Sequence, residues 1–350
     1  MASYSVQPAL YARSSNVRRN DQARYMAAKN YPKNAWDSLG IGLSEWNWNN
    51  RLGTEKWQDG VLMDICRGPM LLHIWSDNDI IAEDRPQMAE FIDLLKSSPE
   101  CFKNPFPLNN PYKDDWWGYC CSDGKKAFIG INNGAFEDQQ VNLSLNSLWG
   151  LPDGVEWDIY CWYPDHIRYQ PSAKNAFGTN EKIIIRPSTA VLLEVVPRGH
   201  KPALKFKDWK DAEMPVSFSE KPRELEVKTN VKKSEESYDF SVKGQLPVLK
   251  TEGWLVVTTE FRRGDEPAFS IYNKPLSMAS SLGGKKVEFV AALDNPVYSA
   301  PWQTYRLPVK KSDSEKKFSL NCTIDRIKSK LKDGDVDIQI RSHYIPWEIG

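Results

Sequence analysis

The first 105 or so residues alternate helical and strand-like segments, whereas the rest of the chain has the pattern of short strands. Two nearly all-apolar runs, Leu39–Ser44 and Met70–Trp75, are typical of strands buried on both faces. Helical patterns at Asp21–Lys29, Trp57–Cys66 and Arg85–Lys96 lie before, between and after these runs. Such alternation implies a parallel sheet covered by helices. Two strands are too few for a stable sheet of this kind, so the sequence predicts the C-terminal portion of a (β/α)8 barrel. A complete barrel has about 250 residues.

The helix expected over Arg85–Lys96 has a clear apolar face. Pro86 lies in its first turn, where proline is tolerated. Its apolar residues on one face are Met88, Phe91, Ile92 and Leu95. We therefore expect this helix to pack against a neighbouring layer through that face.

Residues 109–198 predict an antiparallel β-sandwich, because six short strands follow one another with turns between them. The expected strands are Gly118–Ser122, Lys126–Asn132, Gln140–Leu145, Trp157–Tyr163, Lys182–Arg186 and Ala190–Val196. Asp123-Gly124 has the sequence of a two-residue hairpin turn between the first two strands.

After a linker at residues 197–202, residues 203–350 predict a second, jelly-roll-like β-sandwich that is richer in Lys and Glu. The expected strands are Gly253–Phe261, Lys286–Leu293, Trp302–Val309, Lys317–Cys322 and Asp335–Arg341. Thr323–Leu331 is expected as a short helix, and the charge run Lys232–Glu236 as solvated surface. The domain division is thus 1–108, 109–198 and 203–350.

Charge and hydropathy exclude several classes of protein. The chain has 46 basic and 46 acidic residues, so it lacks the basic surplus that nucleic-acid binding needs, and no nucleic-acid partner is expected. No apolar run reaches the roughly 18 residues of a membrane helix, and no membrane partner is expected. The first residues show no signal peptide, so they do not indicate the cellular compartment. The sequence does not indicate the oligomeric state either.

The six cysteines match no zinc-binding spacing, and neither a metal nor a cofactor is expected. Most of them are expected to be buried thiols. Cys120 and Cys121 are adjacent, so in a strand their side chains would point to opposite faces. A disulfide between Cys161 and either Cys120 or Cys121 is an alternative.

Candidate functional residues follow the predicted parallel strands, because active residues of such folds lie at the C-terminal strand ends. The candidates are Arg19, Asp21, Glu45, Trp46, Trp48, Trp75 and Asp77. Carboxylates beside aromatic rings are what glycoside cleavage needs, since one carboxyl acts as acid/base and flat apolar rings contact sugar faces.

Each carboxylate also has a structural alternative. Asp21 could cap the helix that follows it. Glu45 could pair with Arg51, and Asp77 could be a turn residue. His73, inside an apolar run, is more often a core histidine than a functional one.

Tryptophan is abundant, with 14 residues in the chain. Trp46, Trp48 and Trp75 fall at strand ends, where a sugar would bind. Trp117, Trp157, Trp162 and Trp254 fall in expected sandwich strands and are expected in the core or on a sheet surface.

Residues 10–198 resemble the melibiase-like glycoside hydrolases of the α-galactosidase clan. Arg19-Asn20-Asp21 resembles the loop after their sixth barrel strand, Ser38–Trp48 the seventh strand, and Trp57–Leu72 the helix that leads into the eighth. Trp75-Ser76-Asp77 stands where that eighth strand ends in Asp. The segments GYCCSDGKKAFIGINNG and STAVLLEVVP are similar to the first hairpin and the last strand of their C-terminal sandwich.

The resemblance implies a glycoside hydrolase in which Asp21 is the acid/base. Arg19, Glu45, Trp46, Trp48, Trp75 and Asp77 would then bind an oligosaccharide or polysaccharide. The loop at Glu45 lacks the acidic-proline signature of the clan. Barrel strands one to five, and with them the nucleophile on the fourth, have no counterpart, so the chain alone is expected to be an inactive C-terminal part. The parent protein is expected to be secreted or periplasmic.

The alternative from another class is a non-catalytic carbohydrate-binding or adhesion protein built of β-sandwiches. Residues 203–350 have no counterpart in the α-galactosidase clan, and they are a candidate carbohydrate-binding unit.

Overall fold

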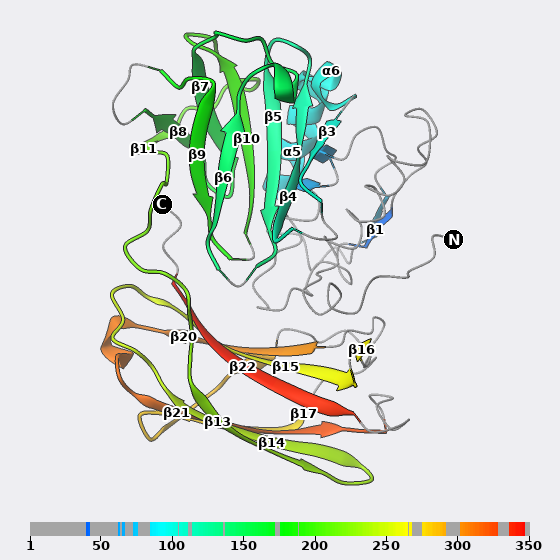
Figure 1. Cartoon of the computed structure of the whole chain (residues 1–350), viewed down its shortest axis with the longest axis vertical. Helices are drawn as coiled ribbons and strands as arrows, with labels where there is room; N and C mark the ends of the chain where they lie inside the picture. The colour runs from blue at the N-terminus through cyan, green and yellow to red at the C-terminus, as the bar shows by residue number, and fades with distance from the viewer. Residues whose placement is uncertain are drawn as a thin grey trace.

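The computed structural model describes residues 40–42, 62–63, 65–66, 73–75, 85–103, 105–110, 114–135, 137–171, 176–187, 189–264, 266–267, 275–291, 302–327 and 336–346. These residues form a small α/β part and two β-sandwiches that follow one another along the chain (Figure 1).

The α/β part contains the parallel strand pair that the sequence predicts. Strand β1 (Gly40–Gly42) pairs with β2 (His73–Trp75), with Gly40 opposite His73 and Gly42 opposite Trp75. Helix α5 (Arg85–Ser97) extends one residue beyond the expected helix and is followed by the short α6 (Pro99–Phe102). Of the expected barrel, the described part of the chain contains this one strand pair.

Helix α5 packs on the first sandwich through the face that contains Phe91 and Leu94. Phe91 and Leu94 are fully buried, while Ile92 and Leu95 are partly buried. Leu94 was not part of the expected face, so the contact stripe is turned slightly from the predicted one. Because the helix is buried on this side, it is fixed to the sandwich that follows it in sequence.

The first sandwich has a seven-stranded sheet and a two-stranded sheet. The large sheet has the order β11-β8-β7-β10-β5-β4-β3, and β6 pairs with β9 in the small one. The strands are β3 (Pro105–Leu108), β4 (Trp116–Ser122), β5 (Ala127–Asn133), β6 (Gln139–Ser144), β7 (Trp157–Tyr163), β8 (Ile167–Gln170), β9 (Asn180–Ile185), β10 (Thr189–Pro197) and β11 (Lys210–Glu213), with a 3-10 turn at Ser147–Trp149. The large sheet extends beyond the predicted 109–198 at both edges, because β3 and β11 belong to it.

The connection between β4 and β5 is longer than expected. Ser122 pairs with Ala127, so four residues form the turn instead of two. The Asp123 carboxylate accepts hydrogen bonds from the backbone N–H groups of Lys125 and Lys126, both at 2.9 Å, and Gly124 has φ of 85°. The aspartate therefore closes the turn by satisfying two backbone donors.

The central strands of the large sheet are buried on both faces, which explains their continuous apolar sequences. All seven residues of β5 are buried. One face meets the small sheet around Val141, Ile129 and Leu193, and the other meets the helical layer. Gly130 lies on the helical side, where an added Cβ would come within 2.7 Å of Cys66 Sγ. The glycine thus permits close approach of the helical layer.

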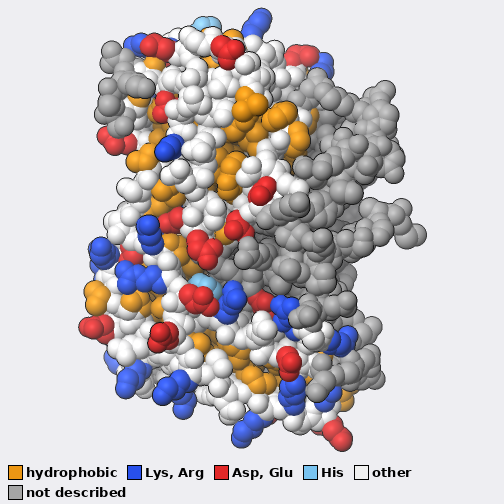
Figure 2. All heavy atoms as spheres, viewed as in Figure 1, with side chains coloured by type: hydrophobic (Ala, Val, Ile, Leu, Met, Phe, Trp, Pro, Cys, Tyr) orange, Lys and Arg blue, Asp and Glu red, His pale blue; other side chains and the backbone are white. Residues whose placement is uncertain are grey.

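The second sandwich has a six-stranded and a five-stranded sheet. The first has the order β12-β22-β15-β20-β19 with β16 paired to β15, and the second β13-β14-β21-β17-β18. Its strands are β12 (Arg223–Glu224), β13 (Val227–Lys233), β14 (Ser237–Gln245), β15 (Gly253–Arg263), β16 (Glu266–Pro267), β17 (Pro275–Leu282), β18 (Lys285–Val287), β19 (Val290–Ala291), β20 (Trp302–Val309), β21 (Lys317–Asp325) and β22 (Asp337–Pro346), with a 3-10 turn at Lys311–Asp313. Lys and Arg side chains gather mainly over this sandwich in Figure 2.

Two expectations for this sandwich need correction. Thr323–Asp325 are not helical but continue β21, where Ile324 is buried between two half-buried neighbours. The predicted strand Lys286–Leu293 is broken into β18 and β19. The charge run Lys232–Glu236 is exposed as expected and forms the end of the β13–β14 hairpin.

Arg186 and Glu220 join the two sandwiches. Arg186, which follows β9, donates from Nη1 to the Glu220 carbonyl oxygen at 2.8 Å and to Asp138 Oδ2 at 3.1 Å. The buried Glu220 carboxylate accepts from the Thr251 backbone N–H at 2.9 Å and from the Tyr344 hydroxyl at 3.0 Å. Burial, together with the carboxylate, raises the pKa of Tyr344 to about 12, so its hydroxyl stays a proton donor. The segment between the sandwiches is therefore held from both sides.

Candidate functional site

The parallel pairing of β1 and β2 brings two predicted site segments to one sheet edge. Gly42 and Trp75 are opposite each other and are the last residues of their strands. In sequence, Glu45 follows β1 by three positions and Asp77 follows β2 by two. Because parallel strands end at the same edge, the chain enters both segments from neighbouring points.

Most predicted site residues lie outside the described part of the chain. These are Arg19, Asp21, Glu45, Trp46, Trp48 and Asp77. Trp75 is described as the last residue of β2, and His73 as its first, opposite Gly40. The structure thus supplies the strand ends of this candidate site, and the roles of its side chains stay predictions.

The five-stranded sheet carries a second candidate site, a polar groove on its outer face. Alternate residues of β14 and β21, such as Phe240 and Cys322, point into the sandwich core. The residues between them face outward in two registered rows: Lys232, Asp239, Thr323 and Ser277 in one, and Asn230, Ser241, Asn321 and Ala279 in the other. Together with Phe240, Met278 and Cys322, which alternate with them along the strands, these eight residues line a hollow of about 360 Å³, which we call the polar groove. Sequence reasoning missed it.

Most polar groups of the groove are available to a ligand. The Thr323 hydroxyl donates to Asp239 Oδ1 at 2.6 Å. Within the described ranges, the side-chain amides of Asn230 and Asn321 and the hydroxyl of Ser241 have no protein hydrogen-bond partner. The groove therefore offers donors and acceptors of both kinds, together with one lysine and one aspartate.

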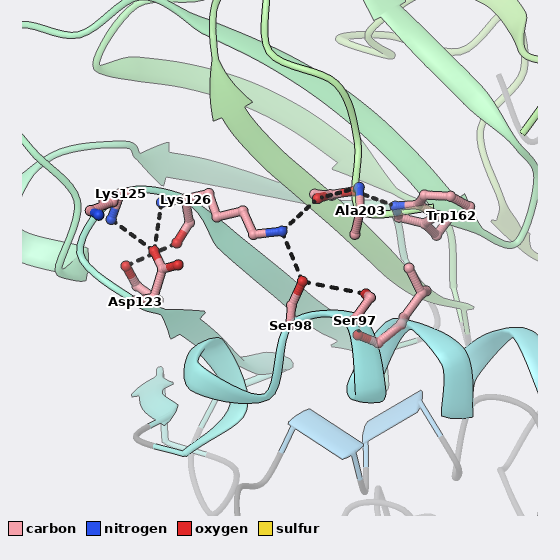
Figure 3. A network of polar contacts seen from close by, with 10 residues as sticks. Ser97, Ser98, Asp123, Lys125, Lys126, Trp162 and Ala203 are labelled. Atoms are coloured by element: carbon pink, nitrogen blue, oxygen red, sulfur yellow. Dashed lines mark hydrogen bonds and ion pairs between the residues drawn. The ribbon is translucent and has the colours of Figure 1, made fainter. Parts of the chain in front are cut away.

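A buried carboxylate, Glu194, binds the helices and the interdomain segment to the large sheet. Its side chain is completely buried in β10 and accepts from Trp162 Nε1 at 2.9 Å and from the Ala203 backbone N–H at 2.9 Å. Lys126 Nζ lies 3.3 Å from Glu194 Oε1. It also donates to Ser98 Oγ at 2.8 Å, and Figure 3 shows the Lys126 side chain directed at Ser98. With its oxygens occupied, this carboxylate has a structural role. In the sequence, Glu194 is the one charged residue of the apolar run TAVLLEVVP, and this position indicates a buried, paired carboxylate.

Aromatic rings beside this network are packed on one another. The Trp209 ring meets Trp162 edge-on with 4.8 Å between centroids, and Phe206 stacks on His166 at 4.0 Å. His166 Nε2 lies 2.7 Å from Glu90 Oε2 on α5. Trp162 belongs to the core on this face of the large sheet, and the partly buried Phe206 and Trp209 pack against that core.

All six cysteines are buried free thiols, as the sequence predicts, and the alternative disulfide is absent. Cys121 faces the helical core and Cys120 the core between the sheets, which confirms that they point to opposite faces. Cys121 Sγ lies 3.2 Å from the Cys66 carbonyl oxygen. Burial raises the pKa of the Cys101 and Cys161 thiols to about 12. A buried thiol with a raised pKa is a poor nucleophile, so these thiols are unsuited to catalysis.

We expect the native chain to resist thiol modification. With the pKa of Cys101, Cys161 and Cys322 raised to about 12, the reactive thiolates stay scarce near pH 8. Titration with Ellman's reagent should detect almost no thiol in the native chain and all six in guanidinium chloride. Rapid modification of several thiols without denaturant would contradict the burial described here.

In the described ranges, no group of three or more His, Cys, Asp and Glu side chains is placed to hold a metal ion. Among the helices of the same ranges, none has the length and apolar character needed to cross a membrane.

No protein-family model and no curated protein matches the chain. Among solved structures, the chain is similar to a GH27 β-L-arabinopyranosidase from Geobacillus stearothermophilus at 13% identity and a TM-score of 0.33, with 53% of this chain and 43% of that one covered. It is also similar to a family 86 β-porphyranase from the human gut bacterium Bacteroides plebeius at 10% identity and a TM-score of 0.24, with 66% and 36% covered. The chain thus spans less than half of either protein. Likenesses at these scores carry no argument for its fold or activity.

Proposed function

We propose that this chain is part of a carbohydrate-active protein that binds a sugar at the C-terminal edge of β1 and β2. The observation that carries the proposal is the parallel register, in which Gly42 is opposite Trp75. The segments that begin there contain Glu45, Trp46 and Trp48 after one strand and Asp77 after the other. Carboxylates and aromatic rings entering from one edge have the chemistry of a sugar pocket.

The finer proposal is a glycoside hydrolase of the α-galactosidase type. Asp21 is the acid/base, which protonates the leaving oxygen of the glycosidic bond, and Arg19 lies two residues before it. The domains are then the end of a (β/α)8 barrel at 1–108 and sandwiches at 109–198 and 203–350. The packing of α5 on the first sandwich, through Phe91 and Leu94, supports this order.

This proposal requires a nucleophile that the resemblance assigns to the fourth barrel strand. Within the described ranges β1 and β2 pair only with each other, whereas a closed barrel would pair both of their outer edges as well. The 350-residue chain is therefore proposed to lack hydrolytic activity by itself. Robust hydrolysis of aryl glycosides by the purified chain would contradict this part of the proposal.

The test of catalysis uses a protein that supplies the remaining barrel strands. There, Asp21→Asn should lower turnover about 10²–10⁴-fold, since general acid–base catalysis contributes about that much. Glu45→Gln should lower kcat/KM by weakening sugar binding. Glu235→Gln is the matched control, because Glu235 is an exposed carboxylate in the β13–β14 turn. It should leave both turnover and binding unchanged.

The second candidate function is a non-catalytic carbohydrate-binding or adhesion protein. The polar groove favours it, because that site lies wholly within the second sandwich. Unchanged turnover in Asp21→Asn and Glu45→Gln, together with lost sugar binding, would support this function over catalysis.

A further inference from the structure

We infer that the polar groove binds one or two neutral sugar units of a glycan chain. The inference deepens the proposed carbohydrate function and rests on it, but it concerns a different site from the strand edge. The groove lies on the five-stranded sheet, which forms the layer of the second sandwich away from the first sandwich (Figure 1). A glycan could therefore reach it without displacing the first sandwich.

The shape of the polar groove suits a small ligand. The floor of the groove consists of short side chains, with Ser241, Ser277 and Ala279 among them, while the neighbouring row on the same face contains Lys228 and Lys243. Short residues in register across the strands leave the hollow of about 360 Å³. This volume falls within the range of about 300–1,000 Å³ that small-molecule sites occupy.

The hydrogen-bonding groups of the polar groove match the hydroxyls of a sugar. Each sugar hydroxyl both donates and accepts, so it is matched by amides and hydroxyls, which do the same. Asn230 and Asn321 face the groove across Ser241, and their amides have no partner among the described residues. Asp239 keeps Oδ2 available, because Thr323 donates to Oδ1.

The charge of the groove lining favours a neutral sugar over anionic ligands. Lys232 is opposite Asp239, so the lining has one positive and one negative side chain. A phosphate or an acidic glycan in the groove would face the Asp239 carboxylate. A polynucleotide would need several cationic contacts, whereas Lys232 is the one cation of the lining, and Lys228 and Lys243 lie in the next row outside it.

The experiment measures glycan binding by the full 350-residue chain. The probe is an array of neutral oligosaccharides with sialylated oligosaccharides beside them, followed by titration calorimetry with the neutral oligosaccharide that binds best. Asn321→Ala should weaken binding about tenfold, the equivalent of one or two lost hydrogen bonds. Ala279→Trp should abolish binding by filling the hollow. Both positions are exposed, so the folded state should be retained.

Lys243→Ala is the matched control, because Lys243 is exposed on the same face but outside the groove. It should bind like the unchanged chain. The inference is overturned if no neutral oligosaccharide binds, if sialylated ones bind better, or if binding survives Ala279→Trp. Binding that survives Ala279→Trp but is lost in Trp75→Ala would assign the sugar to the strand edge and leave the proposed function intact. Failure of the catalytic proposal shows separately, as unchanged turnover of Asp21→Asn in the protein that supplies the remaining barrel strands.

Discussion

Replacing Glu194 by Leu is expected to lower the free energy of unfolding by about 3–5 kcal/mol, the usual cost of removing one partner of a buried charge pair. Trp162 Nε1 and the Ala203 N–H would lose their acceptor, and Lys126 would lose its counter-charge. The interdomain segment at Ala203 and the helices at Ser98 are both held by this network, so the loss should extend beyond β10. Urea denaturation followed by circular dichroism measures the change.

Lys126→Met is the matched control for Glu194→Leu. It removes the cation, which is about one-quarter exposed, but leaves the carboxylate bonded to Trp162 and Ala203. It should therefore cost less than the change at Glu194, about 1–2 kcal/mol, as expected for a hydrogen bond to a charged group. Equal losses in the two variants would show that the ion pair, and not the buried acceptor, holds this layer.

Truncation of Trp157 to Ala should be comparably severe, at about 3–5 kcal/mol for a fully buried tryptophan. The ring lies between the two sheets of the first sandwich with no exposed surface, and its Nε1 donates to the Leu145 carbonyl oxygen at 3.2 Å. The midpoint of urea denaturation, monitored by circular dichroism, should shift accordingly. Trp157→Phe should recover most of the loss, because it restores packing without the hydrogen bond.

Leu148→Ala provides a surface reference for Trp157. Leu148 lies in the 3-10 turn between the same sheets and is 65% exposed, so its truncation should change stability by no more than about 0.5 kcal/mol. A similar loss at positions 148 and 157 would mean that the core between the sheets is not closed in solution.

Strands buried on both faces were predictable from the sequence. β4, β5, β7 and β10 lie within two residues of their predicted bounds, because each is a short apolar run limited by turn residues. β13 and β17 were missed, since one face of each is solvated and carries lysine or small polar side chains. β14 alternates strictly, with Tyr238, Phe240 and Val242 buried, and a search for period-two patterning could have found it.

The two candidate sites differ in how far sequence reasoning could reach them. Glu45 and Asp77 follow apolar runs directly, so the rule for strand ends selects them without knowledge of the fold. The polar groove could not be found in this way, because its residues come from four strands. Asn230 and Asn321 come to flank Ser241 only through the register of β13, β14 and β21. A single outward-facing Asn or Ser in such a strand has nothing that separates it from ordinary surface.

The junction at Arg186 and Glu220 also determines how an immobilised molecule would behave. A flexible linker lets a tethered module sample a large volume, whereas a junction held by buried hydrogen bonds restricts it to a narrow range of orientations. If the groove anchors the protein to a polysaccharide, the strand edge would stay at a fixed reach from its anchor point. Neighbouring glycan within that reach would be present at a high local concentration, and glycan beyond it would be inaccessible until the anchor dissociates.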